Sequence, residues 1–235
     1  MPTFLVTGVS RGIGRAVAER LGADGHQVYG VARTARSVND LTLAGLAELD
    51  LSRAADFGAA LAPLLGSLER LDGLVHCAGI VRPGPLAQAT PADFTDQFAV
   101  NVVAAVELTR LWLPALRAGT GTVVFVNSGS GLNARSPLSA YGTSKYALRG
   151  YVEALRQEEP AVRISTVYPG RTATDMQRSV RAAEAGGYDE AGYLRPSTVA
   201  AVIASMLMLP ADATITDLTV RPASQPGPSS PDAHR

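Results

Sequence analysis

Short apolar runs alternate with longer amphipathic ones along the chain. The short runs predict strands over residues 4–7, 28–32, 46–49, 71–77, 123–127, 164–168 and 216–220. Helical periodicity predicts helices between them over residues 14–23, 54–65, 93–116, 140–157 and 198–209. Apolar strands that alternate with helices predict an α/β fold: a mostly parallel, seven-stranded sheet with helices on both faces and right-handed crossovers. Such a sheet binds ligands at the carboxyl ends of its strands.

The chain of 235 residues predicts one domain over residues 1–222, because 46% of the residues are apolar and no linker or repeat divides them. One long irregular segment, residues 171–196, follows the sixth predicted strand and is expected to carry the substrate loop. It is either a lid or an ordinary surface excursion with one short helix. Residues 223–235 are rich in proline and serine and are expected to be disordered.

Charge and cysteine content narrow the class of partner. Lys and Arg balance Asp and Glu at 21 each, so we expect no binding to nucleic acid or to an anionic membrane.

The longest apolar helical stretch, residues 199–209, is too short to cross a bilayer of about 30 Å. Cys77 is the only cysteine and no signal segment precedes the first strand, so a reducing, cytoplasmic location is expected. The 3 histidines have no metal-binding spacing, and no metal site is expected.

A glycine-rich turn joins the first predicted strand to the first predicted helix. It reads Thr-Gly-Val-Ser-Arg-Gly-Ile-Gly over residues 7–14. Its glycines permit tight backbone geometry and close approach, while the free amides and the positive end of the helix face an anion. Glycine also ends strands for steric reasons alone, but the position of this turn favours binding of a dinucleotide phosphate.

The chain has a single lysine, Lys145, against 20 arginines (21 basic residues less this one), and it stands four residues after Tyr141. On a helix this spacing puts both side chains on one face. A nearby ammonium that favours the phenolate would lower the pKa of the tyrosine toward a useful acid/base range. The alternative is a surface lysine left behind by an arginine-rich composition.

Several motifs together resemble the short-chain dehydrogenase/reductase family. They are TGxxxGxG at residues 7–14, YxxxK at residues 141–145, Ser128 thirteen residues before the tyrosine, and Asn101 in the preceding long helix. The resemblance runs from about residue 3 to residue 220. It implies a Rossmann-type, doubly wound fold and an oxidoreductase that moves a hydride between a nicotinamide dinucleotide and a carbonyl or secondary alcohol.

The resemblance also implies the catalytic roles. Tyr141 would donate or accept the proton, and Ser128 would hydrogen-bond the substrate oxygen. Lys145 would bind the nicotinamide ribose and lower the pKa of the tyrosine, and Asn101 would hold a water that links this lysine to solvent. Without the tyrosine, Ser128 and Asn101 would be read as turn chemistry and an ordinary helix residue. Val126 rules out a G-x-S-x-G elbow at Ser128, which disfavours hydrolase chemistry.

Further positions match the cofactor contacts of the family, with Asp50 and Leu51 implied at the adenine and Thr172 and Thr174 at the pyrophosphate or carboxamide. The full set of implied cofactor-binding residues is Gly8, Ser10, Arg11, Gly12, Ile13, Gly14, Arg33, Asp50, Leu51, Ala78, Gly79, Asn101, Tyr141, Lys145, Pro169, Gly170, Thr172 and Thr174.

The end of the second strand bears on the choice of dinucleotide. NAD-binding members present an acid there to the ribose hydroxyls, whereas this chain has Ala32 followed by Arg33. Arg33 and Arg11 of the glycine turn can grip a 2′-phosphate, so the prediction is NADP(H). The alternative is that Arg33 and Arg36 are solvated loop arginines.

The chain departs from the family pattern at two places. The usual Asn-Asn-Ala-Gly is His76-Cys77-Ala78-Gly79 here, and Cys77 is interpreted as a small buried filler and not a nucleophile. The last strand passes into the Pro-Ser tail without the glycine-rich ending common in the family, which puts a tetramer contact there in question. The helices around Asn101 and Tyr141 resemble those that pair subunits, so a homodimer or homotetramer is expected.

The sequence therefore predicts an NADP(H)-dependent oxidoreductase, with reduction of a small ketone, aldehyde, oxo-acid or oxoacyl compound as the working direction. Arginines in the loop after Pro169 would permit a carboxylate-bearing substrate, although solvated loop charges explain them as well. Two rival functions stay open at this point. One is a catalytically silent redox sensor that binds NADP(H), and the other is an epimerase or dehydratase with retained cofactor.

Overall fold

A seven-stranded, fully parallel sheet forms the centre of the structure, a computed structural model that describes residues 1–223. The strand order is β3-β2-β1-β4-β5-β6-β7, which confirms the predicted α/β, doubly wound fold. Apart from Ala223, the predicted tail lies outside the described residues. The strands are β1 (Thr3–Thr7), β2 (Gln27–Ala32), β3 (Gly45–Glu48), β4 (Gly73–His76), β5 (Thr122–Val126), β6 (Arg163–Pro169) and β7 (Asp217–Val220).

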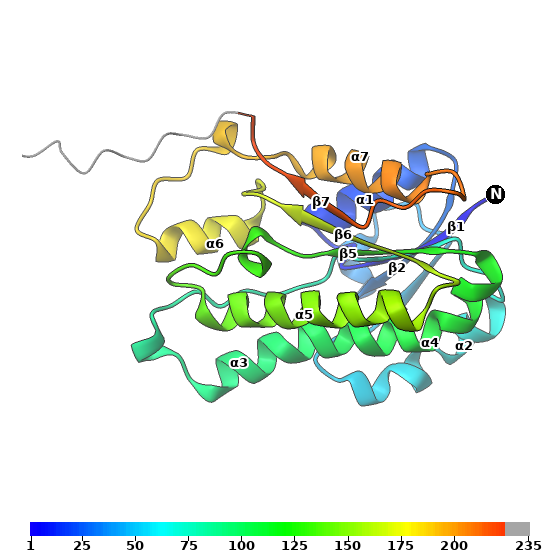
Figure 1. Cartoon of the computed structure of the whole chain (residues 1–235), viewed down its shortest axis with the longest axis horizontal. Helices are drawn as coiled ribbons and strands as arrows, with labels where there is room; N and C mark the ends of the chain where they lie inside the picture. The colour runs from blue at the N-terminus through cyan, green and yellow to red at the C-terminus, as the bar shows by residue number, and fades with distance from the viewer. Residues whose placement is uncertain (224–235) are drawn as a thin grey trace, which may run out of the picture.

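Helices cover both faces of the sheet, as Figure 1 shows. One face carries α1 (Gly12–Ala23) and α7 (Pro196–Leu207), and the other carries α2 (Phe57–Ser67), α4 (Ala104–Gly119) and α5 (Ser139–Glu158). Each face has its own apolar cluster, one around Phe125 and Trp112 and the other around Val6 and Ile203. Strands with apolar side chains on both faces need such double cover, which explains their continuous apolar sequences.

The helix predicted over residues 93–116 is a continuous run of three parts. It comprises α3 (Pro91–Phe98), a π-helical segment (Ala99–Val103) and α4. Thr90 and Asp93 form a reciprocal capping box at its start, which fixes where the run begins. Within residues 1–223 this run of 29 residues is long and apolar enough to cross a membrane, so residues 199–209 are not the longest apolar helical stretch, although the helix there is short, as predicted. Its side chains Leu108 and Trp112 are packed in the core of the domain.

The chain order reverses between β1 and β4. From β1 the sheet grows through β2 to β3 on one side, and through β4 to β7 on the other, so the loops after β1 and β4 diverge and leave a crevice. The loop predicted over residues 171–196 contains α6 (Asp175–Ala183) and a 3₁₀ turn (Glu190–Gly192). α6 lies beyond the carboxyl ends of the strands (Figure 1). The segment thus contains one short α-helix, which was one of the alternatives expected for it.

Candidate active site

The glycine turn after β1 has the backbone shape that its sequence predicts. Gly8 and Gly12 have φ angles of +73° and +59°, in the left-handed region that side chains disfavour. A Cβ on Gly14 would run into the carbonyl oxygen of Gly8, so the first turn of α1 packs directly on the loop. Arg11 stands at the N-cap of α1 without a side-chain cap, which leaves the first amides of the helix available to an acceptor.

The segment His76-Cys77-Ala78-Gly79 closes the other side of the crevice. The Thr7 hydroxyl accepts hydrogen bonds from the amides of Cys77 and Ala78, both at 3.1 Å, and so joins the ends of β1 and β4. His76 is buried, stacks on Phe125 with ring centroids 4.8 Å apart, and pairs with the Thr109 hydroxyl at 2.9 Å. His76, which replaces one of the usual amides, therefore serves packing, and the small residues Ala78 and Gly79 still line the crevice.

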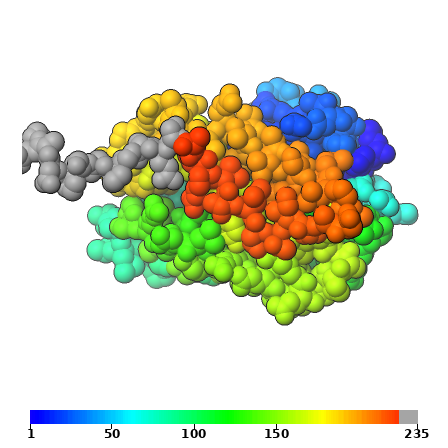
Figure 2. Space-filling model, turned by 45° about the horizontal axis from the view of Figure 1, so that its top comes forward, coloured from blue at the N-terminus to red at the C-terminus, as the bar shows by residue number. Residues whose placement is uncertain are grey.

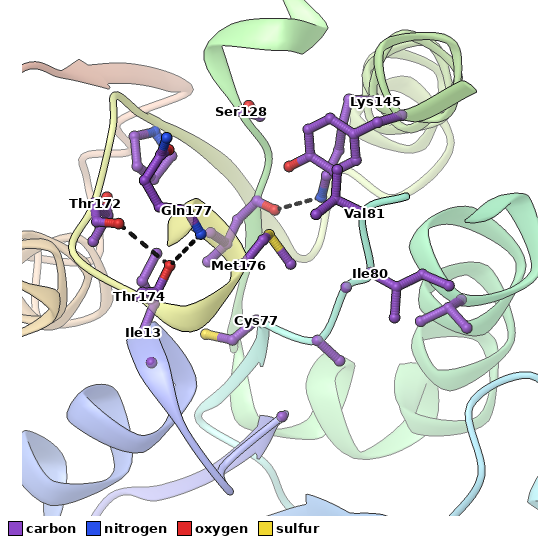
Figure 3. Close-up of a pocket in the computed structure, with 18 of the residues that line it drawn as sticks. Ile13, Cys77, Ile80, Val81, Ser128, Lys145, Thr172, Thr174, Met176 and Gln177 are labelled. Atoms are coloured by element: carbon purple, nitrogen blue, oxygen red, sulfur yellow. Dashed lines mark hydrogen bonds between the residues drawn. The ribbon is translucent and has the colours of Figure 1, made fainter. Parts of the chain in front are cut away.

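Cys77 is a small side chain packed against the core cluster around Val6, as predicted, but it is half-buried and not fully buried, because it also lines the cleft. The alternation of side chains past the end of β4 turns it toward the open space between α1 and α6. Figure 3 shows it beneath Met176 and near Ile13. Burial in apolar surroundings raises the pKa of its thiol, which keeps it protonated and unreactive at neutral pH, in agreement with the prediction that it is not a nucleophile.

The cleft wall after β2 and β3 carries Arg33, Asp50 and Leu51. The Asp50 carboxylate accepts bonds from the Ser52 amide at 3.0 Å and the Ser52 hydroxyl at 2.8 Å, and these bonds lower its pKa. Arg33 is exposed and makes no ion pair with any residue of the described range 1–223. Arg11, by contrast, lies 3.5 Å from Asp175 of α6, so only one of the two predicted phosphate-binding arginines lacks an acidic partner.

Ser128, Tyr141 and Lys145 meet at the carboxyl end of β5, where α5 crosses the sheet. All three line the cleft. The Ser128 hydroxyl accepts a bond from the Ser130 amide at 3.1 Å and caps a short 3₁₀ turn, which leaves its own proton to donate. Lys145 is only 4% exposed, and its Nζ donates to the Val126 carbonyl oxygen at 3.0 Å. The Nζ atom lies 5.9 Å from the centre of the Tyr141 ring. Lys145 is therefore a buried cleft residue and not a leftover surface lysine.

The direction of the Tyr141 pKa differs from the prediction. Burial raises the pKa of the phenol, the Ser128 hydroxyl opposes this shift, and the tyrosine stays protonated at neutral pH. The expected lowering by Lys145 is not seen, because burial also lowers the pKa of Lys145 from 10.5 to about 8 and its ammonium is bonded to Val126. The pair thus combines a neutral phenol with an amine that titrates close to physiological pH.

Asn101 does not line the main cleft but lies behind it, in the π-helical segment. Its Oδ1 accepts from the Ile80 amide at 2.8 Å, and its Nδ2 donates to the Ile80 carbonyl at 3.0 Å and to the Ser144 hydroxyl at 3.0 Å. These bonds hold the loop after β4 against α5. Within the described residues its side-chain groups are thus engaged by protein, which makes Asn101 a positioning residue in this geometry.

Two polar residues escaped the sequence analysis and position the site. Asn127, directly after β5, accepts from the Ser128 amide at 2.8 Å and donates to the Lys145 carbonyl at 3.2 Å, so one side-chain amide holds the segments of Ser128 and Lys145 together. Ser144 is fully buried, accepts from Asn101 and donates to the Tyr141 carbonyl at 2.7 Å. Their position, one residue from Ser128 and Lys145, was a usable signal that the family motif does not include.

The segment after β6 supplies the remaining wall. Pro169, Gly170, Thr172 and Thr174 all line the cleft, as predicted by their place in the chain. The Thr174 hydroxyl caps α6 by accepting from the Gln177 amide at 3.2 Å, and the Thr172 hydroxyl donates to the Gly170 carbonyl at 3.0 Å. Figure 3 shows Thr172, Thr174, Met176 and Gln177 on one side of the cleft, opposite Lys145 and Val81.

Together these loops enclose one cleft of about 830 Å³. Of the predicted site residues, all but Gly14 and Asn101 line it, and these two lie directly behind its wall. Other lining residues were not predicted, among them Arg82, Ser130, Asn133, Arg135, Gln177 and Arg221. Within residues 1–223, no three His, Cys, Asp or Glu side chains are grouped to hold a metal ion.

Comparisons with known proteins agree with this geometry. The sequence model of the short chain dehydrogenase family matches residues 2–185. Human dehydrogenase/reductase SDR family member 11 is 30% identical, over 94% of this chain and 94% of its own. An alcohol dehydrogenase from the archaeon Thermococcus sibiricus, solved with 5-hydroxy-NADP, is 25% identical with a TM-score of 0.87, over 96% of this chain and 98% of that one. A short chain dehydrogenase from Escherichia coli CFT073, solved with NADPH, is 26% identical with a TM-score of 0.85, over 93% and 95%.

The fold and the site therefore define an oxidoreductase of the Rossmann class. The chain belongs to the short-chain dehydrogenase/reductase family. A nicotinamide dinucleotide fits the residues present, because the left-handed glycines, the uncapped start of α1 and the cleft that runs from there to Lys145 form a continuous cradle.

Proposed function

We propose that the protein reduces the carbonyl group of a small molecule to a secondary alcohol with NADPH. The observation that carries the proposal is the meeting of Ser128, Tyr141 and Lys145 at one end of a cleft whose other end is a phosphate-binding glycine turn. The dinucleotide would supply the hydride to the carbonyl carbon. The side chains of the protein then have to hold the carbonyl oxygen and give it a proton.

Two hydroxyls are suited to that task. Ser128 has its oxygen occupied by the Ser130 amide, so its hydrogen is free to point at a substrate oxygen. Tyr141 has a raised pKa and carries its proton at neutral pH, so it can donate that proton to the oxygen as negative charge develops there. The protonated phenol favours reduction as the working direction, because oxidation would need the phenolate as a base.

Lys145 is proposed to bind the ribose of the cofactor and to return a proton to Tyr141. Its pKa of about 8 lets it lose and regain a proton at modest cost near neutral pH. Its fixed contact with Val126 holds the amine below the cleft floor, where Gly79 leaves room beside Asn101. The roles of these residues follow the resemblance, and the geometry is consistent with them.

NADPH is proposed over NADH because of the cleft wall after β2. Ala32 ends this strand where an acid would bind the ribose hydroxyls of NAD, and Arg33 follows it, exposed and without an ion pair in the described part of the chain. A free guanidinium at that place is a ready partner for a 2′-phosphate. The two solved relatives with NADP-type ligands are consistent with this choice.

Cofactor oxidation with a panel of aldehydes, ketones and oxo-acids tests the proposal. The wild-type protein should oxidise NADPH well and NADH poorly, and Tyr141→Phe should lower kcat by about 10²- to 10⁴-fold, the usual contribution of a proton donor. Arg33→Ala should weaken NADPH binding and leave NADH binding unchanged. Equal use of the two dinucleotides by both proteins would contradict the cofactor assignment.

The same assay separates an enzyme from a silent sensor. If the protein binds NADPH tightly and no carbonyl compound is reduced under any condition, the sensor alternative is correct and the proposal fails. A substrate that returns epimerised or dehydrated, with no net change in NADPH, would support the other rival.

A further inference from the structure

Arg221 stands in the wall of the cleft directly after β7, close to the proposed catalytic serine. A Cβ on Gly129, the residue after Ser128, would lie 2.8 Å from Nη1 of Arg221, and one on Gly170 would lie 3.3 Å from its Cδ. The side chain therefore passes between two glycines of different loops. In Figure 2 the C-terminal part of the described chain, in red, lies beside a green segment of the surface.

The backbone around Arg221 is fixed as well. The Gly170 amide donates to the Val220 carbonyl at 2.7 Å, so the ends of β6 and β7 stay paired up to the residue before Arg221. The two glycines leave room for the Arg221 side chain, and the hydrogen-bonded end of the strand fixes its backbone. The guanidinium therefore has a defined position. A seated cation loses less rotational freedom on binding an anion than a solvated one.

Most other arginines of the cleft have acidic partners. Arg11 pairs with Asp175, Arg82 with Asp93 and Asp96, and Arg171 with Glu184. In the described range 1–223, Arg221 makes no ion pair, unlike these three arginines of the cleft.

Three arginines of the loop after Pro169 have acidic partners, and Arg195, which makes no ion pair within the described residues, does not line the cleft. Arg171 and Arg181 share Glu184, at 2.9 and 2.6 Å, and Arg178 pairs with Glu190 at 3.2 Å. The cation that is available beside Ser128 comes instead from the end of the last strand.

We propose that Arg221 binds an oxyanion on the substrate, a carboxylate or a phosphate carried a few bonds from the carbonyl that is reduced. This inference rests on the proposed function and narrows it to a class of anionic carbonyl compounds. The planar guanidinium donates two parallel hydrogen bonds to such a group, which fixes the direction from which the carbonyl approaches Ser128. The glycine turn and Arg33, which are proposed to hold the phosphates of the cofactor, lie after β1 and β2, whereas Arg221 follows the edge strand on the other side of β4.

The test compares acids with their neutral counterparts. The substrates are 2-oxobutanoate, acetoacetate and 4-oxopentanoate, each against its methyl ester, and dihydroxyacetone phosphate against dihydroxyacetone, all with NADPH. The wild-type protein should prefer the anionic member of at least one pair, and the best chain length reports the spacing between carbonyl and anion. Arg221→Gln should lower kcat/KM for that anion by about 10- to 100-fold, as expected for lost charge-assisted hydrogen bonds, and change the neutral partner by less than about threefold.

Matched variants separate a specific contact from general charge. Arg221→Lys keeps the positive charge but cannot donate two parallel hydrogen bonds, so it should retain part of the preference for the anionic substrate. Arg20→Gln removes the same charge from α1 away from the cleft, where Arg20 pairs with Asp24, and should leave the preference intact. Arg135→Gln removes another cleft arginine that, like Arg33, makes no ion pair within the described chain.

Four results would overturn the assignment of Arg221. In the first, Arg221→Gln lowers kcat/KM equally for the anionic and the neutral substrate, and in the second the wild-type protein shows no preference for the anion. In the third, Arg135→Gln and not Arg221→Gln removes the preference, and in the fourth a lower affinity of Arg221→Gln for NADPH accounts for the whole loss of activity. Reduction of the neutral ketones without anion preference leaves the proposed function standing and rejects only this inference. Reduction of no compound at all rejects both.

Discussion

At the residue scale, the site depends on how burial shifts the pKa values of three titratable groups. Burial lowers the pKa of His76 to about 3, lowers that of Lys145 to about 8 and raises that of Tyr141. Each shift favours the uncharged form, as expected where water is excluded. A neutral imidazole, a protonated phenol and a readily deprotonated amine therefore lie together under the catalytic end of the cleft.

The buried lysine predicts a pH dependence of stability. Below pH 8 the native protein holds an ammonium in a site that disfavours it, whereas the unfolded chain binds the same proton with a pKa of 10.5. The unfolded state thus binds more protons between these values, and the free energy of unfolding rises with pH by about 3 kcal/mol across this window. Lys145→Met lacks this titration.

Denaturant unfolding of wild type and Lys145→Met at several pH values would measure the effect. The difference in unfolding free energy, wild type minus variant, should grow in favour of wild type from pH 7 to pH 10.5. A difference that stays constant over this range would show that the lysine titrates normally. The comparison cancels the titration of groups that both proteins share.

At the element scale, the π-helical segment between α3 and α4 is the feature that shapes the site. It interrupts an otherwise regular helix at Asn101, and such bulges often occur at functional sites. The hydrogen bonds of Asn101 to both backbone groups of Ile80 give a physical reason, since they hold the side chain toward the loop after β4.

Asn101→Ala would leave the amide and carbonyl of Ile80 without this partner. We expect the free energy of unfolding to fall by about 2 to 4 kcal/mol, because two partly buried backbone groups lose their hydrogen bonds. Asn39→Ala, at an exposed turn, is the control and should change stability by less than about 0.5 kcal/mol. Chemical denaturation measures both. Equal, small effects would mean that water replaces the amide at no cost.

At the scale of the whole molecule, exposed apolar side chains accompany the α4 and α5 helices. Val103 is 47% exposed, Tyr146 43% and Leu132 37%. Tyr146 and Leu132 are neighbours, because the Tyr146 hydroxyl donates to the Leu132 carbonyl at 2.7 Å, and adjacent exposed apolar side chains favour a contact with another protein. We propose a homodimer through these helices.

Light scattering after size-exclusion chromatography tests this assembly. The wild-type protein should have twice its chain mass of 24.4 kDa or a higher even multiple. Val103→Glu should give the monomer, whereas Leu86→Glu, which adds the same charge at a 70% exposed loop residue, should not. A monomeric wild-type protein at micromolar concentration would contradict the proposal.

Much of the fold was predictable because the signals are local. All seven strands, and helices in each predicted interval, were found from periodicity, since the face of a strand or helix depends on residues a few positions apart. The glycine turn was also found in this way, because Gly8 and Gly12 adopt angles that few other residues permit. The π-helical segment was missed, and the short helix at residues 175–183 was expected only as an alternative without bounds, because long-range contacts and capping determine them.

The sequence by itself determined the family, the order of the elements and the position of the proposed catalytic residues in the chain. Only the tertiary structure decided which charges are free and which groups change their pKa. Arg171 and Arg181 both form ion pairs with Glu184, so their charges are not free to bind a ligand. Arg221, near the C-terminal end of the chain, lies beside Gly129. The reason is physical: pairing and desolvation depend on distances across the folded molecule, and neighbouring sequence does not record them.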